Sequence, residues 1–150
     1  MISGGGVFYS DAMEDLSNFA IKHNIPVTQT VMGYSTMKRD HSHFLGPIGG
    51  LGGKAANNLA KQTDLAIAVG TKLADFTTGS WANFENPDFS LVSVNVSRFD
   101  ANKHLAQSVI GDAKVSLQEL SNALGDWKAP DEWHKKLSLI HISEPTRPLY

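Results

Sequence analysis

The segment Leu65–Val69 reads Leu-Ala-Ile-Ala-Val and is apolar at every position. A strand that faces water on one side alternates apolar and polar residues, whereas a strand covered on both sides can be apolar throughout. Continuous apolar strands are typical of parallel sheets, because the crossover helices cover both sheet faces. Gly70 follows the run directly, so we expect a fully buried strand that ends at this glycine.

The patterns on either side of this strand alternate between helical and extended periods. We expect two helices before it, at 11–23, where Ser10 and Asp11 offer a cap, and at 54–63. One helix is expected after it, and Asp112 caps that helix. Further strands are expected at 25–30, 91–96 and 107–110, while the glycine-rich stretch 31–53 is expected to be a long loop. This alternation predicts an α/β fold with a Rossmann-like, doubly wound parallel sheet, without fixing the strand order.

Composition excludes several classes of function. The chain has 150 residues, which suggests one domain, and its net charge of -2 offers no basic field for nucleic acid or an anionic membrane. The absence of cysteine excludes disulfides, thiolate zinc sites and a cysteine nucleophile. No apolar run is long enough to span a bilayer and no signal segment opens the chain, so we expect a soluble, cytoplasmic protein.

Two glycine clusters, Gly4–Gly6 and Gly49–Gly53, each precede an expected helix and have two interpretations. They could let backbone amides approach a phosphate, or they could form tight turns that pack closely on the sheet. No acidic residue ends the strand through Thr28–Thr30, as a dinucleotide site requires, and neither cluster contains the Gly-Lys-Ser/Thr of a P-loop. The packing interpretation is therefore favoured for both clusters.

The remaining polar candidates do not form a recognisable active site. His41 and His43 could approach a metal, but an ordinary zinc site needs a third protein ligand, so a polar loop is the favoured interpretation. Ser35 lacks the final glycine of a nucleophile elbow. The single carboxylates Asp75, Asp100 and Asp112 follow strands or precede a helix, and Asp112 is explained as a cap. These patterns alone predict no catalytic, cofactor-binding or metal-binding residue.

Several segments resemble the central domain of thiamine-diphosphate enzymes. They are Ile2–Ala12, Asn57–Ala60, Ala66–Leu73, Val94–Val96, Ala101–His104 and Ile110–Ala113. Within that superfamily, Gly46–Gly49 and Asp75–Ala82 resemble the trihydroxycyclohexane-dione hydrolases of myo-inositol catabolism. That resemblance covers about residues 1–136. It implies an enzyme that opens a cyclohexane-1,2-dione ring hydrolytically to 5-deoxyglucuronate, with thiamine diphosphate held through Mg²⁺.

The same resemblance implies that the catalytic groups lie outside this chain. In the superfamily, the activating glutamate belongs to the preceding domain, and the metal-binding Gly-Asp-Gly motif belongs to the following domain. No Gly-Asp-Gly occurs here, and Gly111–Ala113 is not that motif. We therefore expect an inactive structural spacer whose partners are flanking thiamine-binding domains, in a homo-oligomer that acts on a small-molecule substrate.

One alternative is a central domain that binds FAD or a nucleotide, as in relatives of acetohydroxyacid synthase. The flavin-binding members resemble Arg-Phe-Asp-Asp-Arg-x-Thr-Gly after the strand, and the matching run here is Lys72–Gly79. Both arginines are replaced, by Lys72 and Phe76, so we do not expect FAD. A stand-alone Rossmann-like protein with a structural role is the remaining alternative.

The resemblance also predicts how the chain is divided. We expect residues 1–128 to be the central domain, truncated at its amino side, and residues 129–136 to begin a linker to a missing C-terminal domain. Residues 137–150 are interpreted as an artefact, because Leu137–Arg147 reads like a translated transposon-end adapter from DNA sequencing libraries. The natural sequence is then expected to stop near Lys136.

Overall fold

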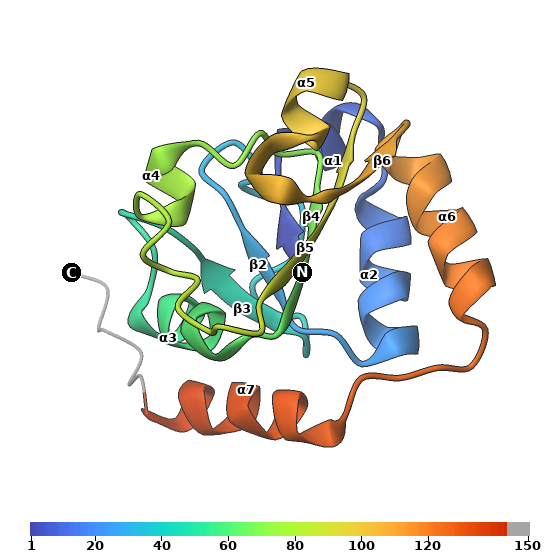
Figure 1. Ribbon diagram of the computed structural model, residues 1–150. Coiled ribbons are helices and arrows are strands. Elements are labelled where there is room, and N and C mark those ends of the chain that lie inside the picture. Colours follow the sequence, from blue (N-terminus) through green and yellow to red (C-terminus); the bar gives the residue numbers. More distant parts are fainter. Residues whose placement is uncertain (144–150) are drawn as a thin grey trace.

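A computed structural model describes the backbone of residues 1–143 and the side chains of residues 1–138. Within this part of the chain, six strands form one parallel sheet in the order β3-β2-β1-β4-β5-β6 (Figure 1). The strands are β1 (Ile2–Ser3), β2 (Val27–Gln29), β3 (Phe44–Pro47), β4 (Leu65–Val69), β5 (Ser90–Asn95) and β6 (Gln107–Ile110). The predicted α/β, doubly wound fold is confirmed, and the order is that of a Rossmann sheet.

Helices lie on both faces of this sheet, and others lie where its strands begin or end (Figure 1). They are α1 (Gly5–Tyr9), α2 (Met13–His23), α3 (Lys54–Gln62), α4 (Asp75–Thr78), α5 (Arg98–Ala101), α6 (Ala113–Leu124) and α7 (Asp131–Ser143), with a 3-10 turn η1 (Lys103–Leu105). Helices α2 and α6 pack on one face and α3 on the other, while α7 crosses the edge where the strands begin. Within residues 1–143, no helix is both long and apolar enough to cross a bilayer.

Strand β4 is buried on both faces toward its end, as its sequence predicts, whereas Leu65 at its start is 49% exposed, so the expectation of a fully buried strand is wrong there. Val69 belongs to the core under α2 and α6, whereas Ala68 belongs to the core under α3, and neither residue has any exposed surface. Successive side chains of a strand point to opposite faces, so an apolar residue is needed at each position. On α3, the small side chains of Ala56 and Ala60 allow that helix to pack closely on the sheet.

The predicted loop 31–53 is wrong in its second half, because Phe44–Pro47 forms β3, while residues 48–53 have no regular secondary structure. The sequence Phe-Leu-Gly-Pro contains two residues that are rare in strands, which hides the element. Strand β3 lies at the edge of the sheet, where a proline without an N–H is tolerated. The short helices α1 and α4 also lie where no helix was predicted, since one turn has no periodic pattern.

The predictions for helix capping differ in outcome. Asp112 caps α6 as expected, and its carboxylate accepts hydrogen bonds from the N–H groups of Lys114 at 2.9 Å and Val115 at 3.1 Å. The cap predicted at Ser10 and Asp11 is wrong, because α2 begins after Ala12 and has no side-chain cap. Asp11 instead has a φ of 52°, in the turn that leaves α1.

Residues 131–136, expected to begin a linker, belong to α7 in the structure. Leu137 of this helix is buried against the rest of the molecule, at 1% exposure. The domain division and the adapter origin of residues 137–150 stay predictions, and the expected artefact falls partly outside the described residues, at 144–150.

Candidate functional site

The strands of a parallel sheet all end on the same edge, called here the carboxyl edge. In open α/β sheets, ligands bind at this edge where the strand order reverses, which in this order is between β1 and β4. Gly4–Gly6 follow β1 and Gly70 follows β4, so both segments lie at the reversal point. Their geometry decides whether a ligand could enter there.

Backbone packing fills this reversal point. A β-carbon at Gly4 would lie 2.4 Å from the carbonyl oxygen of Gly70, and one at Gly6 would lie 2.6 Å from the α-carbon of Gly70. Gly70 itself has a φ of 63°, and its carbonyl accepts the Gly6 N–H at 2.9 Å. These contacts support the packing interpretation of Gly4–Gly6, because Gly4 and Gly6 lie so close to the backbone of Gly70 that neither has room for a β-carbon.

Hydrogen bonds hold the loop after β2 against the end of β1. The Ser3 hydroxyl donates to the Thr36 hydroxyl at 2.7 Å, and Thr36 in turn donates to the Gly33 carbonyl at 2.7 Å. A β-carbon at Gly33 would lie 2.2 Å from the Ser3 carbonyl oxygen, so this approach also requires glycine. Ser35, considered as a nucleophile, is exposed on this loop and has a left-handed backbone with a φ of 70°.

Gly46–Gly49 and Asp75–Ala82, the two segments that resemble the dione hydrolases, come together at the carboxyl edge. The Gly50 N–H donates to the Phe76 carbonyl at 2.9 Å, which joins the loop after β3 to helix α4. The side-chain amide of Asn57 binds both peptide groups of Gly49, accepting its N–H at 3.0 Å and donating to its carbonyl at 3.1 Å. Gly49 has a φ of 100°, so Asn57 supports a backbone conformation that only glycine adopts easily.

Several left-handed residues surround this junction. Leu73, Ser80, Trp81, His104 and Leu105 all have positive φ between 48° and 71°. The indole of Trp81 stacks on the His104 imidazole, with ring centroids 4.1 Å apart, and His104 Nε2 lies 3.3 Å from the Leu73 carbonyl oxygen. Such backbone conformations cost free energy and persist only where the surrounding contacts enforce them.

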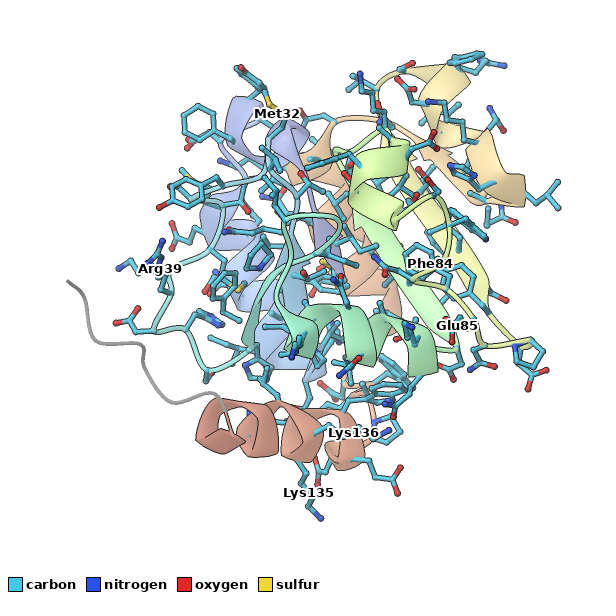
Figure 2. All side chains as sticks on the ribbon, turned by 90° about the vertical axis from the view of Figure 1, so that its left-hand side faces the viewer. Met32, Arg39, Phe84, Glu85, Lys135 and Lys136 are labelled. Atoms are coloured by element: carbon cyan, nitrogen blue, oxygen red, sulfur yellow. The ribbon has the colours of Figure 1, made fainter. Side chains whose placement is uncertain are left out.

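Most of the large apolar side chains that the described residues expose lie in segments that follow strand ends. We name this group the carboxyl-edge surface: Phe8, Tyr9, Val31, Met32, Tyr34, Leu51, Phe76, Val96, Phe99 and Leu105. Figure 2 shows Met32 at the opposite end of the molecule from Lys135 and Lys136 of α7. Apolar side chains gathered on one side of a protein indicate a surface that contacts another protein or domain.

The two histidines considered as metal ligands are held in a polar loop. His41 Nδ1 accepts the His43 N–H at 3.1 Å, and its Nε2 lies 2.9 Å from the Ser17 hydroxyl. His43 Nδ1 lies 2.9 Å from the Ser42 hydroxyl, and its Nε2 lies 3.2 Å from Asn24 Oδ1. Every imidazole nitrogen of this pair therefore has a hydrogen-bond partner, as expected of a polar loop.

The carboxylates are also engaged in local interactions. Asp100 binds Lys103 at 2.9 Å, and this hydrogen bond is the main reason why the pKa of Asp100 is lowered. Hydrogen bonding, first to Ser10, lowers the pKa of Asp112, and Asp75 is exposed at the start of α4. Within the described residues, no three histidine or acidic side chains are grouped so that they could hold a metal ion. These residues therefore do not fit a magnesium-bound cofactor.

The sequence interpretation missed the hydrogen bond from Asn83 Nδ2 to Asn57 Oδ1, at 3.2 Å, and the carboxyl-edge surface. Nothing in the sequence marks Asn83, whereas the many exposed aromatic residues after strands were a signal that could have been used.

The strand order and the helices on both faces of the sheet together define a doubly wound α/β domain. Residues 1–120 match the family model described as "Thiamine pyrophosphate enzyme, central domain". The chain belongs to this family of thiamine pyrophosphate enzyme central domains.

Similar proteins extend the comparison. The chain is 49% identical over 124 residues to a 3D-(3,5/4)-trihydroxycyclohexane-1,2-dione hydrolase of Clostridium perfringens, covering 83% of this chain and 19% of that protein. Hydrolases of the same name from Clostridium tetani and Bacillus cereus are 43% and 41% identical, with 97% and 94% of this chain covered. The chain spans only about a fifth to a quarter of the length of these relatives, 19% to 24%.

A solved structure shares the fold. It is described as that of a thiamin diphosphate-dependent enzyme isolated from Mycobacterium smegmatis, and the match has a TM-score of 0.65 at 17% identity. It covers 84% of this chain and 24% of that chain.

Proposed function

We propose that this chain is the central domain of a thiamine-diphosphate-dependent hydrolase that opens trihydroxycyclohexane-1,2-dione to 5-deoxyglucuronate in myo-inositol catabolism. The observation that carries the proposal is the identity of 41% to 49% to hydrolases of that name. The junction at Gly49, Asn57 and Phe76 supports it, because it joins the two segments whose sequences resemble those hydrolases.

Thiamine diphosphate would supply a carbanion that attacks a substrate carbonyl, with Mg²⁺ holding its diphosphate. The described residues contain no group suited to holding that metal, so we assign no step of the reaction to this chain. Its role in the proposal is to space and orient the catalytic domains, in a cytoplasmic homo-oligomer.

The carboxyl-edge surface is the part of this chain that we propose to contact the other domains of the enzyme. Phe76 is 53% exposed on α4, directly above the junction with Gly50. Leu51 extends from the same loop as Gly50 and is 73% exposed. A fixed backbone below exposed apolar side chains is suited to a specific interface, since little ordering entropy is lost on contact.

A charge placed in this surface tests the proposal in the full-length enzyme. Phe76→Asp should lower dione hydrolysis at least tenfold, because the carboxylate would be buried against the neighbouring domain. Ile21→Asp is a matched control, since Ile21 is equally exposed at 53% but lies on α2. Equal activity of the two variants would contradict the contact, and absence of dione hydrolysis in the parent enzyme would contradict the proposed function itself.

A second test addresses the flavin alternative. A ligand that binds only the folded state must raise its melting temperature, so FAD or ADP is added to the purified chain. We expect no change, because backbone contacts fill the reversal point of the sheet. A rise of a few degrees would favour a nucleotide-binding domain instead. The isolated chain should also show no hydrolase activity with added thiamine diphosphate and Mg²⁺, and measurable turnover would refute its role as a spacer.

A further inference from the structure

The segment between β5 and β6, residues 96–105, projects beyond the ends of the strands as α5 and η1 (Figure 1). We name this segment the α5 corner. Phe99 is 78% exposed and Leu105 is 102% exposed, and Val96 is exposed as well. Ala101 has no exposed surface, because α5 packs there against β5 and β6. The corner is therefore held through a small buried side chain, while its large apolar side chains face solvent.

The backbone of the α5 corner is strained at its end. His104 and Leu105 both have a φ of 58°, in the left-handed region that disfavours residues with a side chain. His104 is held there by its stacking on Trp81 and by the Leu73 carbonyl oxygen. Leu105 is fully exposed, so packing within the described chain does not offset the cost of its conformation. A contact with another surface would offset that cost.

Lys103 links the charged and apolar parts of the α5 corner. Its Nζ lies 2.9 Å from a carboxylate oxygen of Asp100, 3.4 Å from the Lys72 carbonyl oxygen and 5.4 Å from the centroid of the Phe99 ring. One ammonium therefore joins α5 to the chain after β4 and lies over an exposed aromatic ring. These contacts restrict the movement of Lys103 and Phe99, so less ordering entropy is lost when a partner binds.

Positive charge exceeds negative charge around the corner, although the whole chain has a net charge of -2. Lys72, Arg98 and Lys103 supply three cations, whereas Asp100, and Asp75 three residues after Lys72, supply two carboxylates. Among the described residues, no carboxylate forms an ion pair with Lys72 or Arg98. A two-fold contact between copies of this corner would bring the cations together, so an acidic partner is favoured over a second copy.

We propose that the α5 corner binds an acidic surface on a neighbouring domain of the enzyme, with Leu105 and Phe99 as its apolar anchors. Arg98 and Lys72 then face carboxylates of that domain, where charge-assisted hydrogen bonds are stronger than neutral ones. The inference rests on the proposed function in one respect, namely that this chain is part of a longer enzyme. It adds the chemistry of one partner of the carboxyl-edge surface, since the charges select the partner and the anchors supply affinity.

The first test uses Leu105→Asn in the full-length enzyme. Asparagine adopts the left-handed conformation more readily than leucine, so the substitution relieves strain while it removes the apolar anchor. The melting temperature should fall by several degrees, and the amides of residues 99–106 should exchange hydrogen at least tenfold faster. An unchanged or higher melting temperature, or unchanged exchange, would overturn the proposal, because strain relief would then be opposed by no lost contact.

The second test changes the charge of the corner. Arg98→Glu in the full-length enzyme should also speed exchange of the amides of residues 99–106 at least tenfold, because it would bring like charges together. Lys135→Glu is the matched control, since it makes the same change in charge at an exposed position on α7, at the opposite end of the molecule (Figure 2). Equal effects of the two substitutions on this exchange would overturn the acidic partner.

A membrane surface also attracts apolar and basic side chains, and vesicles that contain phosphatidylserine distinguish it from a protein partner. The full-length enzyme should not bind these vesicles, and binding that Leu105→Asn abolishes would overturn the proposal. None of these readouts involves dione hydrolysis, so failure here is distinct from failure of the proposed function.

Discussion

Asn83 donates a hydrogen bond from Nδ2 to Asn57 Oδ1 at 3.2 Å, across 26 residues of sequence. The same Asn57 oxygen accepts the Gly49 N–H, so one side-chain amide joins three segments: helix α3, the loop after β3 and the chain after α4. These segments support the part of the carboxyl-edge surface that contains Leu51 and Phe76. Removing single members of this network and of the glycine contacts should therefore have large and specific effects.

Asn57→Ala should lower the free energy of unfolding by about 1–3 kcal/mol, because it leaves both peptide groups of Gly49 without their partner. Urea denaturation of the isolated chain measures the change. Asn58→Ala is the matched control, since Asn58 is exposed on the same helix and should change stability by less than about 0.5 kcal/mol. Equal effects of the two substitutions would contradict the role given to Asn57.

Gly70→Ala should destabilise the fold by roughly 2 kcal/mol or more. The new β-carbon would lie 2.6 Å from the Gly6 α-carbon, at a φ of 63° that disfavours any side chain. Gly53→Ala is the control, because a β-carbon at Gly53 would have no neighbour within 4 Å. Thermal melting of both variants checks the prediction, and a Gly70→Ala protein as stable as Gly53→Ala would show that the strand ends are not in close contact.

Stability should decrease in mild acid because of His43. Burial, and then the imidazoles of His134 and His41, lower the pKa of His43 from 6.5 to about 4. Between these two pH values the unfolded chain binds a proton that the folded chain does not, so the free energy of unfolding should fall as the pH falls from about 6.5 to about 4. Urea midpoints measured across this range test the direction.

The control for the acid prediction is His43→Gln, whose amide could still donate to Asn24 Oδ1, as His43 Nε2 does at 3.2 Å. Its stability should depend less on pH between 6.5 and 4 than that of the parent chain. The Met1 ammonium, with a pKa lowered to about 5, contributes a loss of the same sign in both proteins and cancels in the comparison. An identical pH dependence of the two proteins would exclude His43 as the cause.

The central architecture could be predicted from sequence because burial leaves a strong pattern there. The apolar run of β4, the small face of α3 and the Asp112 cap each depend on neighbours within a few residues, and all three appear in the structure. Strand β3 could not be predicted, because its Gly46 and Pro47 are tolerated only by its place at the sheet edge. That place is determined by the whole fold rather than by local sequence.

Less of the candidate site than of the fold could be predicted from the sequence. Asn57, Asn83 and Gly49 have no shared spacing along the chain, and only the fold brings helix α3, the chain after α4 and the loop after β3 together. The resemblance of Gly46–Gly49 and Asp75–Ala82 to one hydrolase family marked both segments, but it did not indicate that they touch. The glycine contacts at Gly4 and Gly70 were likewise one of two open interpretations until the strand order was known.

The parallel sheet also bears on how such a domain could diversify. Because every strand ends on the same edge, a substitution at the exposed Leu51, Phe76 or Phe99 changes this surface without disturbing the residues packed between sheet and helices. Related enzymes could thus change the carboxyl-edge surface to suit different neighbouring domains while the buried core stays the same.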